Sequence, residues 1–84
     1  MNETVLVEIK IPALQQYFDF RISQKTTIST IIQNIVDCVM QIGGNRAWAA
    51  HRSEFCLCVR NGVLDNTKTF ANYDIHTGDL LILV

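Results

Sequence analysis

Cysteines are the side chains of this 84-residue chain that are best suited to metal or redox chemistry. Cys56 and Cys58 lie two positions apart, so a strand would point both thiols to one face of a sheet. With Cys38 they would offer zinc three soft ligands, but no C-x-x-C pair or fourth ligand accompanies them. We therefore interpret them as small apolar side chains on a partly covered sheet face, and we expect no metal and no cofactor.

The histidines and aspartates do not form a catalytic pattern. His51 and His76 each stand alone in a loop context, without a serine or cysteine nucleophile arranged around them. Asp65, Asp74 and Asp79 occur where turns are expected, and turn chemistry explains them better than a pair of catalytic carboxylates does. We expect a protein that is not an enzyme.

Charge and hydropathy argue against two kinds of partner. The net charge is −1 and the basic group of Arg46, Arg52 and Arg60 is thin, so no nucleic-acid site is expected. No apolar run approaches the roughly 18 residues of a membrane span, so no direct membrane insertion is expected. The N-terminus has acids where an export signal has positive charges, and three cysteines leave one unpaired, so we expect a cytoplasmic protein with reduced thiols.

Two alternating segments open the chain and predict a hairpin. In residues Thr4 to Ile11, and again in Tyr17 to Ile22, apolar and polar side chains alternate. That period of two is typical of a strand with one buried face. Pro12 ends the first segment because it has no N–H for the ladder, and the short connection has hairpin length.

Residues 27–42 change to helical spacing. Thr27 is a suitable N-cap, and Gly43 and Gly44 can close the helix with left-handed backbone. The apolar residues at this spacing are expected to form the buried face. They are Ile28, Ile31, Ile32, Ile35, Val36, Val39 and Ile42. A short extra helical turn in residues 45–54 is expected to place Trp48 over Val36 or Met40.

The second half of the chain predicts three strands. Phe55 to Val59 is the first, and Asn61-Gly62 predicts a type I′ turn, in which both positions have positive φ. Val63-Leu64 is then a short return strand. The Gly78-Asp79 turn leads into five apolar residues, Leu80 to Val84, which fit a strand in the middle of a sheet.

These elements predict an α+β fold in one domain, residues 1–84. One main helix packs on one face of a mixed sheet, and the last strand inserts beside the first in parallel. The expected strand order is 2-1-5-3-4, which is the β-grasp architecture.

The core positions resemble those of ubiquitin. Residues 27–31, TISTI, are similar to ubiquitin's TIENV, and the block L-x5-F-x2-Y-x-I-x5-L-x-L runs from Leu64 to Leu83 without a gap. The ending I-x-x-G-D-x-L-x-L, from Ile75 to Leu83, resembles that of the small bacterial YukD/EsaB-like family, which accompanies type VII secretion systems. This resemblance implies a non-conjugated cytosolic accessory or regulatory protein that acts through protein contacts, with a membrane component of the secretion system as a candidate partner.

Two other roles stay open: a ubiquitin-like scaffold or regulatory module of another complex, and a sulfur-carrier-like protein. Ubiquitin and the sulfur carriers act through a flexible Gly-Gly carboxylate. This sequence ends with Leu83-Val84 inside the predicted strand and has no diglycine there. We therefore expect neither conjugation nor sulfur transfer.

One apolar surface is expected to bind a protein partner. Six side chains of strands 1, 3 and 5 should face away from the helix and form a patch on the face that ubiquitin uses for its partners. They are Leu6, Cys56, Cys58, Leu80, Ile82 and Val84. Monomeric proteins seldom leave such a patch uncovered. The cover could be a loop of this protein, a second copy or a different protein.

Overall fold

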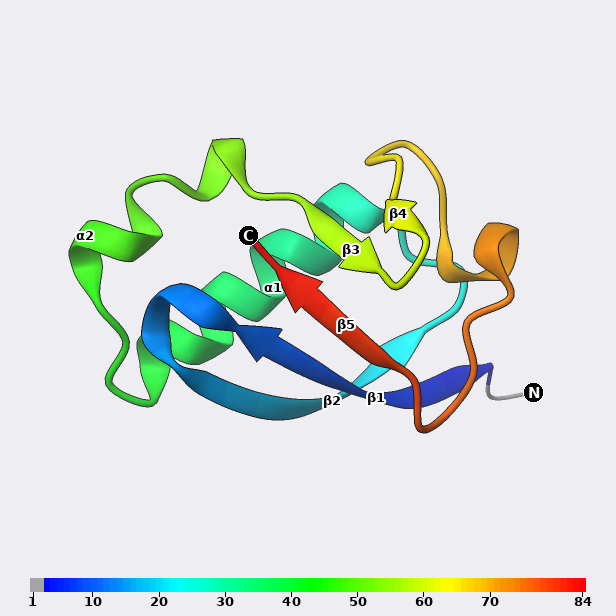
Figure 1. Ribbon diagram of the computed structural model, residues 1–84, viewed down its shortest axis with the longest axis horizontal. Helices are drawn as coiled ribbons and strands as arrows, with labels where there is room; N and C mark the ends of the chain where they lie inside the picture. The colour runs from blue at the N-terminus through cyan, green and yellow to red at the C-terminus, as the bar shows by residue number, and fades with distance from the viewer. Residues whose placement is uncertain (1–2) are drawn as a thin grey trace.

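The computed structural model describes residues 3–84, which form one five-stranded mixed sheet with the main helix packed behind it (Figure 1). The strands are β1 (Thr4–Ile11), β2 (Gln16–Ser23), β3 (Leu57–Val59), β4 (Gly62–Val63) and β5 (Leu80–Leu83). The helices are α1 (Ile28–Gln41) and α2 (Arg46–Ala49), with 3-10 turns at Pro12–Leu14, Arg52–Glu54 and Phe70–Tyr73. The strand order is β2-β1-β5-β3-β4, so the predicted order is confirmed.

The first two strands form the predicted hairpin. They pair antiparallel over their whole length, from Thr4 opposite Ser23 to Ile11 opposite Gln16. Pro12 opens a single 3-10 turn, and the Gln15 N–H donates to the Pro12 carbonyl at 3.0 Å. Gln15 adopts the left-handed conformation at φ 54°, which reverses the chain into β2.

β5 occupies the middle of the sheet. It pairs parallel with β1, with Ile9 opposite Leu81, and antiparallel with β3, with Leu57 opposite Leu83. These four side chains are buried and point toward α1. The apolar character of the final segment thus follows from a strand that has neighbours on both edges and a core on one face.

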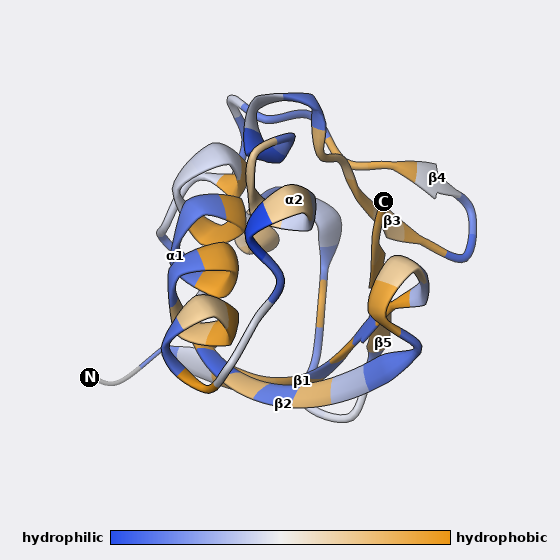
Figure 2. Cartoon of the chain, turned by 90° about the vertical axis from the view of Figure 1, so that its left-hand side faces the viewer, coloured by the Kyte–Doolittle hydropathy of each residue, from blue (hydrophilic) through white to orange (hydrophobic). Residues whose placement is uncertain are grey.

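The α1 helix begins where predicted. The Thr27 hydroxyl accepts the Thr30 N–H at 3.4 Å, and the Ile28 N–H donates to the Lys68 carbonyl at 2.8 Å, so two orphan donors of the first turn are satisfied. Figure 2 shows the apolar side of α1 turned toward the sheet. The buried apolar residues of the helix are Ile28, Ile31, Ile32, Ile35, Val36 and Val39.

The prediction for the end of this helix was wrong in one respect. Ile42 was expected on the buried face, but it follows the last helical residue and is 69% exposed. The chain has already left the helical path there, because Gly43 takes the left-handed conformation at φ 98°. Gly44 does not, and its role is close packing, since a Cβ there would lie 2.7 Å from the Val39 carbonyl oxygen.

The predicted extra helical turn is α2. The Asn45 side chain caps it by accepting the Trp48 N–H at 3.0 Å. The Trp48 ring stacks on Phe55, with ring centroids 5.1 Å apart. The guanidinium of Arg52 ties the following turn to α1, because it donates to the Asp37 carboxylate at 2.8 Å.

The third strand and its hairpin differ from the prediction in register. The strand is Leu57–Val59, not Phe55 to Val59, although the Cys56 N–H still donates to the Val84 carbonyl at 2.6 Å. Val59 pairs with Gly62, so Arg60 and Asn61 are the two turn residues. Asn61 does not have positive φ, and the predicted type I′ turn at Asn61-Gly62 is wrong. The return strand is accordingly Gly62–Val63 rather than Val63-Leu64.

We expect the buried face of α1 to dominate the stability. Ile35 is 1% exposed and lies mid-helix, so Ile35→Ala should lower the free energy of unfolding by about 2–5 kcal/mol through lost burial and a cavity. Thr30→Ala, on the exposed face, should lower it by less than about 1 kcal/mol. Denaturant melts of both variants measure the difference, and equal losses would show that the two faces of α1 are assigned wrongly.

Candidate functional site

The face of the sheet that points away from α1 is the candidate site, and the strand register decides its layout. Ile82 of β5 lies between Lys10 of β1 and Cys58 of β3. Cys58 in turn lies opposite Val63 of β4, and Lys10 extends its ammonium over the Tyr17 ring at 5.7 Å from the centroid. One row of side chains therefore crosses all five strands, and its β5–β3–β4 half is apolar.

The six residues predicted for this face divide into two groups. Leu80, Val84 and Leu6 are exposed, at 47%, 56% and 39%. The other three, Ile82, Cys56 and Cys58, are half-buried. Five of the six lie side by side, because Cys58 pairs with Ile82 and because Cys56 and Val84 exchange two backbone hydrogen bonds of 2.6 and 2.9 Å; these five are Leu80, Ile82, Val84, Cys56 and Cys58.

Leu6 is the one predicted residue that does not lie beside the other five, because of the register between β1 and β5. It was expected to form one patch with Leu80 and Ile82, but Lys10 lies beside Ile82 and Glu8 lies beside Leu80. Leu6 lies beside the turn that precedes β5, where its carbonyl accepts the Gly78 N–H at 2.9 Å. The apolar surface is thus continuous over β5, β3 and β4 and is bordered on β1 by one acid and one base.

Val63 is a member of this face that the sequence analysis missed. It is 62% exposed and directly opposite Cys58. The signal was present in the sequence, because the ubiquitin-like block assigns Leu64 to the core and adjacent residues of an extended segment point to opposite sides. We use the term outer patch for the apolar residues Cys56, Cys58, Val63, Leu80, Ile82 and Val84.

A groove of about 680 Å³ adjoins the outer patch. It is lined by Val59, Arg60, Asn61, Tyr73, Ile75, Gly78, Asp79, Leu80 and Ile82. Its walls are mostly apolar, and Arg60 and Asp79 place one positive and one negative side chain in it. The Tyr73 hydroxyl is already engaged, since it accepts the Asp65 N–H at 2.8 Å, so the phenol contributes mainly its ring.

The Cys58 thiol of the outer patch is a poor nucleophile. Burial, and after it the neighbouring Cys56, raises the pKa of the Cys58 thiol above its ordinary value of 9.0. Cys38 is exposed on α1, on the other side of the sheet. Within residues 3–84, no three His, Cys, Asp or Glu side chains come together as a metal site.

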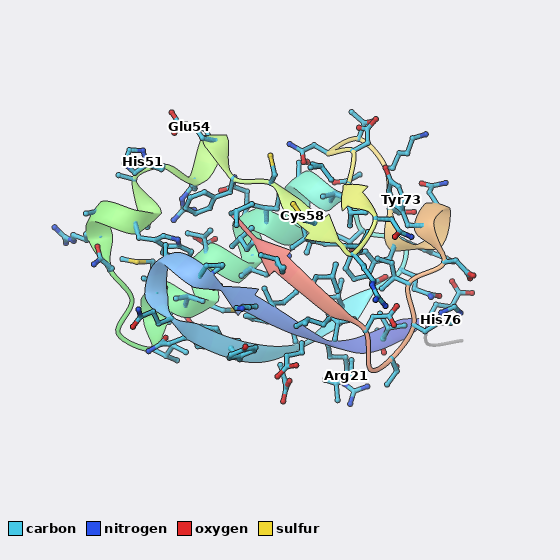
Figure 3. The ribbon with its side chains drawn as sticks, viewed as in Figure 1. Arg21, His51, Glu54, Cys58, Tyr73 and His76 are labelled. Atoms are coloured by element: carbon cyan, nitrogen blue, oxygen red, sulfur yellow. The ribbon has the colours of Figure 1, made fainter. Side chains whose placement is uncertain are left out.

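The histidines pair with acids of their own segments. His51 Nδ1 lies 3.4 Å from the Glu54 carboxylate, and His76 Nε2 lies 3.3 Å from that of Asp74. Figure 3 shows the two histidines toward opposite ends of the molecule, each at the surface. They therefore cannot act on one substrate group.

Two of the three aspartates predicted to serve turns, Asp65 and Asp79, do so through their carboxylates. Hydrogen bonds from the Thr67 N–H and hydroxyl lower the pKa of the Asp65 carboxyl, and nearby Lys68 adds to this. Asp79 accepts the His76 N–H at 2.9 Å, which closes the turn before β5. Both carboxylates thus hold loops in place.

In the described part of the chain, no helix has the length and apolar character needed to cross a bilayer.

The reactivity of Cys58 tests this description of the patch. We expect the alkylation rate of Cys58 by iodoacetamide, followed by mass spectrometry across pH, to give an apparent pKa above 9.0. Cys56→Ser should lower this value only part of the way, because burial is the larger cause. The denatured protein is the control, and a native value at or below the denatured one would contradict the burial of Cys58.

No protein-family model matches the chain, and no curated protein sequence matches it. Among solved structures, the N-terminal ubiquitin-like domain of the 4931431F19Rik protein superposes with a TM-score of 0.72 at 14% identity, over 100% of this chain and 76% of that one. A ubiquitin from Caldiarchaeum subterraneum gives 0.69 at 15% identity, over 95% and 90% of the two chains. A de novo designed protein based on ubiquitin gives 0.72 at 15% identity, over 98% and 88%. The chain therefore has a ubiquitin-like β-grasp fold, as its core residues predicted.

Proposed function

We propose that this protein is a ubiquitin-like interaction module without catalytic activity, and that it binds a protein partner through the outer patch. The observation that supports the proposal is the continuous apolar surface of β5, β3 and β4, in which Val63, Val84 and Leu80 are 62%, 56% and 47% exposed. Burying apolar area on association is favourable, and soluble monomers seldom expose such a surface without a use for it.

The residues around the outer patch indicate the chemistry of the partner's surface. An apolar or aromatic side chain of the partner fits the groove beside Leu80 and Ile82, where Arg60 and Asp79 can pair with charges at its rim. On β1, Glu8 and Lys10 border the patch and offer a second pair of opposite charges. The partner surface is thus apolar at its centre and carries both signs of charge at its edge.

We further propose that the complex is a bacterial type VII secretion system, in which the protein is a cytoplasmic accessory or regulatory component. The support is the resemblance of its ending to that of YukD/EsaB-like proteins, carried by Ile75, Gly78, Asp79, Leu81 and Leu83. These residues build the turn into β5 and its buried side, and β5 presents the outer patch. A membrane component of the secretion system is then the partner that meets this face.

Ile82→Asp tests the binding surface. We expect this variant to fold with little change in its melting midpoint, because Ile82 faces away from the core and Lys10 lies opposite it. It should lose the partner, since moving a carboxylate from water into an apolar interface costs several kcal/mol, even beside Lys10. Affinity capture and titration with the cytosolic part of the secretion-system membrane component measure the loss.

Thr30→Asp is the matched control. It adds the same charge to the exposed face of α1, where a carboxylate in the first turn of a helix is tolerated. The control should keep full binding. If Ile82→Asp folds and binds as well as the control does, the outer patch is not the interface; if it unfolds, Ile82 belongs to the core.

A further inference from the structure

The free edge of β2 is a second surface that this fold leaves open. β2 pairs with β1 along eight residues, and within residues 3–84 no strand pairs with its other side. The opposite edge of the sheet is β4, with only two residues. A long unpaired edge is a template for another strand, and proteins usually block such an edge or use it.

The backbone of β2 presents alternate residues to this edge. The Gln24 N–H donates to the Glu3 carbonyl at 2.8 Å, which marks that pair as hydrogen-bonded. In an antiparallel ladder the hydrogen-bonded pairs alternate, so Phe20 and Phe18 direct their N–H and C=O groups toward β1. Asp19 and Arg21 consequently direct theirs toward the free edge.

The side chains of these two edge residues carry unmatched charges. Within residues 3–84, Asp19 and Arg21 form no ion pair. Asp19 lies directly opposite Glu8 on β1, a like-charge pair that is unfavourable, and Arg21 lies opposite Leu6. Figure 3 shows Arg21 at the lower margin of the sheet, pointing away from it. Among the described residues, neither side chain therefore has a partner of opposite charge.

We propose that two copies of this protein join through antiparallel β2 strands, with the two-fold axis at Phe20. In this register Asp19 of each copy lies opposite Arg21 of the other, so two complementary pairs form by symmetry. Asp19 and Arg21 of both copies also exchange backbone hydrogen bonds across the axis. Moving the axis to Asp19 or to Arg21 would place like charges opposite each other, so charge selects the register.

The β2 side chains that face α1 also fit a second copy of this protein. Phe18, Phe20 and Ile22 point toward α1, and the two aromatic rings are only half-buried, with centroids 6.2 Å apart. In the proposed register Phe20 meets Phe20 of the second copy, and Phe18 meets Ile22. These contacts would complete the burial of side chains that one copy leaves partly open.

Two hollows between β2 and α1 lie along this edge. One, of about 160 Å³, is lined by Phe20, Ile22, Ile31, Ile35 and Cys38 among others. The other, of about 280 Å³, includes Phe18, Val39 and the exposed Ile42. A second sheet edge placed here would cover both, which gives a reason for the exposure of Ile42.

Charge reversal at the edge tests the dimer, measured by sedimentation equilibrium over a range of concentrations. The wild-type chain should dimerise. Asp19→Arg alone and Arg21→Asp alone should each weaken dimerisation by roughly tenfold or more, since both copies then present like charges. An equimolar mixture of the two variants should recover a heterodimer, because the opposite charges face each other again.

The double variant, with both Asp19→Arg and Arg21→Asp, is the matched control. It keeps the wild-type net charge and exchanges the two charges, so it should dimerise like the wild type. A monomeric wild type, or a double variant that stays monomeric while it melts like the wild type, would overturn the proposal. Ile82→Asp should leave the dimer intact; if it abolishes self-association, the copies join through the outer patch and the β2 edge is not the dimer interface.

Discussion

The pairing of β5 on both of its edges is the constraint on which the rest of this structure depends. Its backbone bonds reach β1 through Glu8, whose N–H donates to the Asp79 carbonyl at 3.0 Å, and the β3 segment through Cys56 and Val84. These bonds fix how the strand is rotated about its own axis, and successive side chains then point to opposite faces of the sheet. Leu81 and Leu83 close the core, while Leu80, Ile82 and Val84 are directed outward. The segment of β5 and Val84 thus contributes to the hydrophobic interior on one side and to the outer patch on the other.

Much of the fold could be predicted because its elements carry strong local patterns. Alternation marked β1 and β2, and helical spacing marked α1 with Thr27 as its cap. The features that could not be predicted depend on details that no local pattern encodes. Asn61-Gly62 has the residues of a type I′ turn, yet pairing of Val59 with Gly62 moves the turn back by one residue. Ile42 continues the spacing of α1, but Gly43 ends the helix before that spacing can bury it.

For the candidate site, the sequence predicted which way the side chains point but not which residues of neighbouring strands lie side by side. Alternation was sufficient to say which side chains leave the core, and the five residues of β5 and β3 do lie together. It could not say which residue of β1 meets which residue of β5, because a parallel register is set by the distant connection and not by a tight turn. For that reason Lys10, and not Leu6, neighbours Ile82. The stacking of Trp48 on Phe55 was also beyond reach, because it joins two irregular segments.

The long sequence separation between the paired strands β1 and β5 also affects how the protein folds. Translation delivers β1 first, and the edge of β1 that pairs with β5 has no neighbour until the residues from Pro12 to Asp79 have been synthesised. During that interval the apolar side chains Val5, Val7, Ile9 and Ile11 have only a hairpin and a helix to cover them. Contacts between residues so far apart in sequence form slowly, and unpaired strand edges in nascent chains are prone to aggregate. Pairing of β5 with β1 is therefore a late step in closing the sheet.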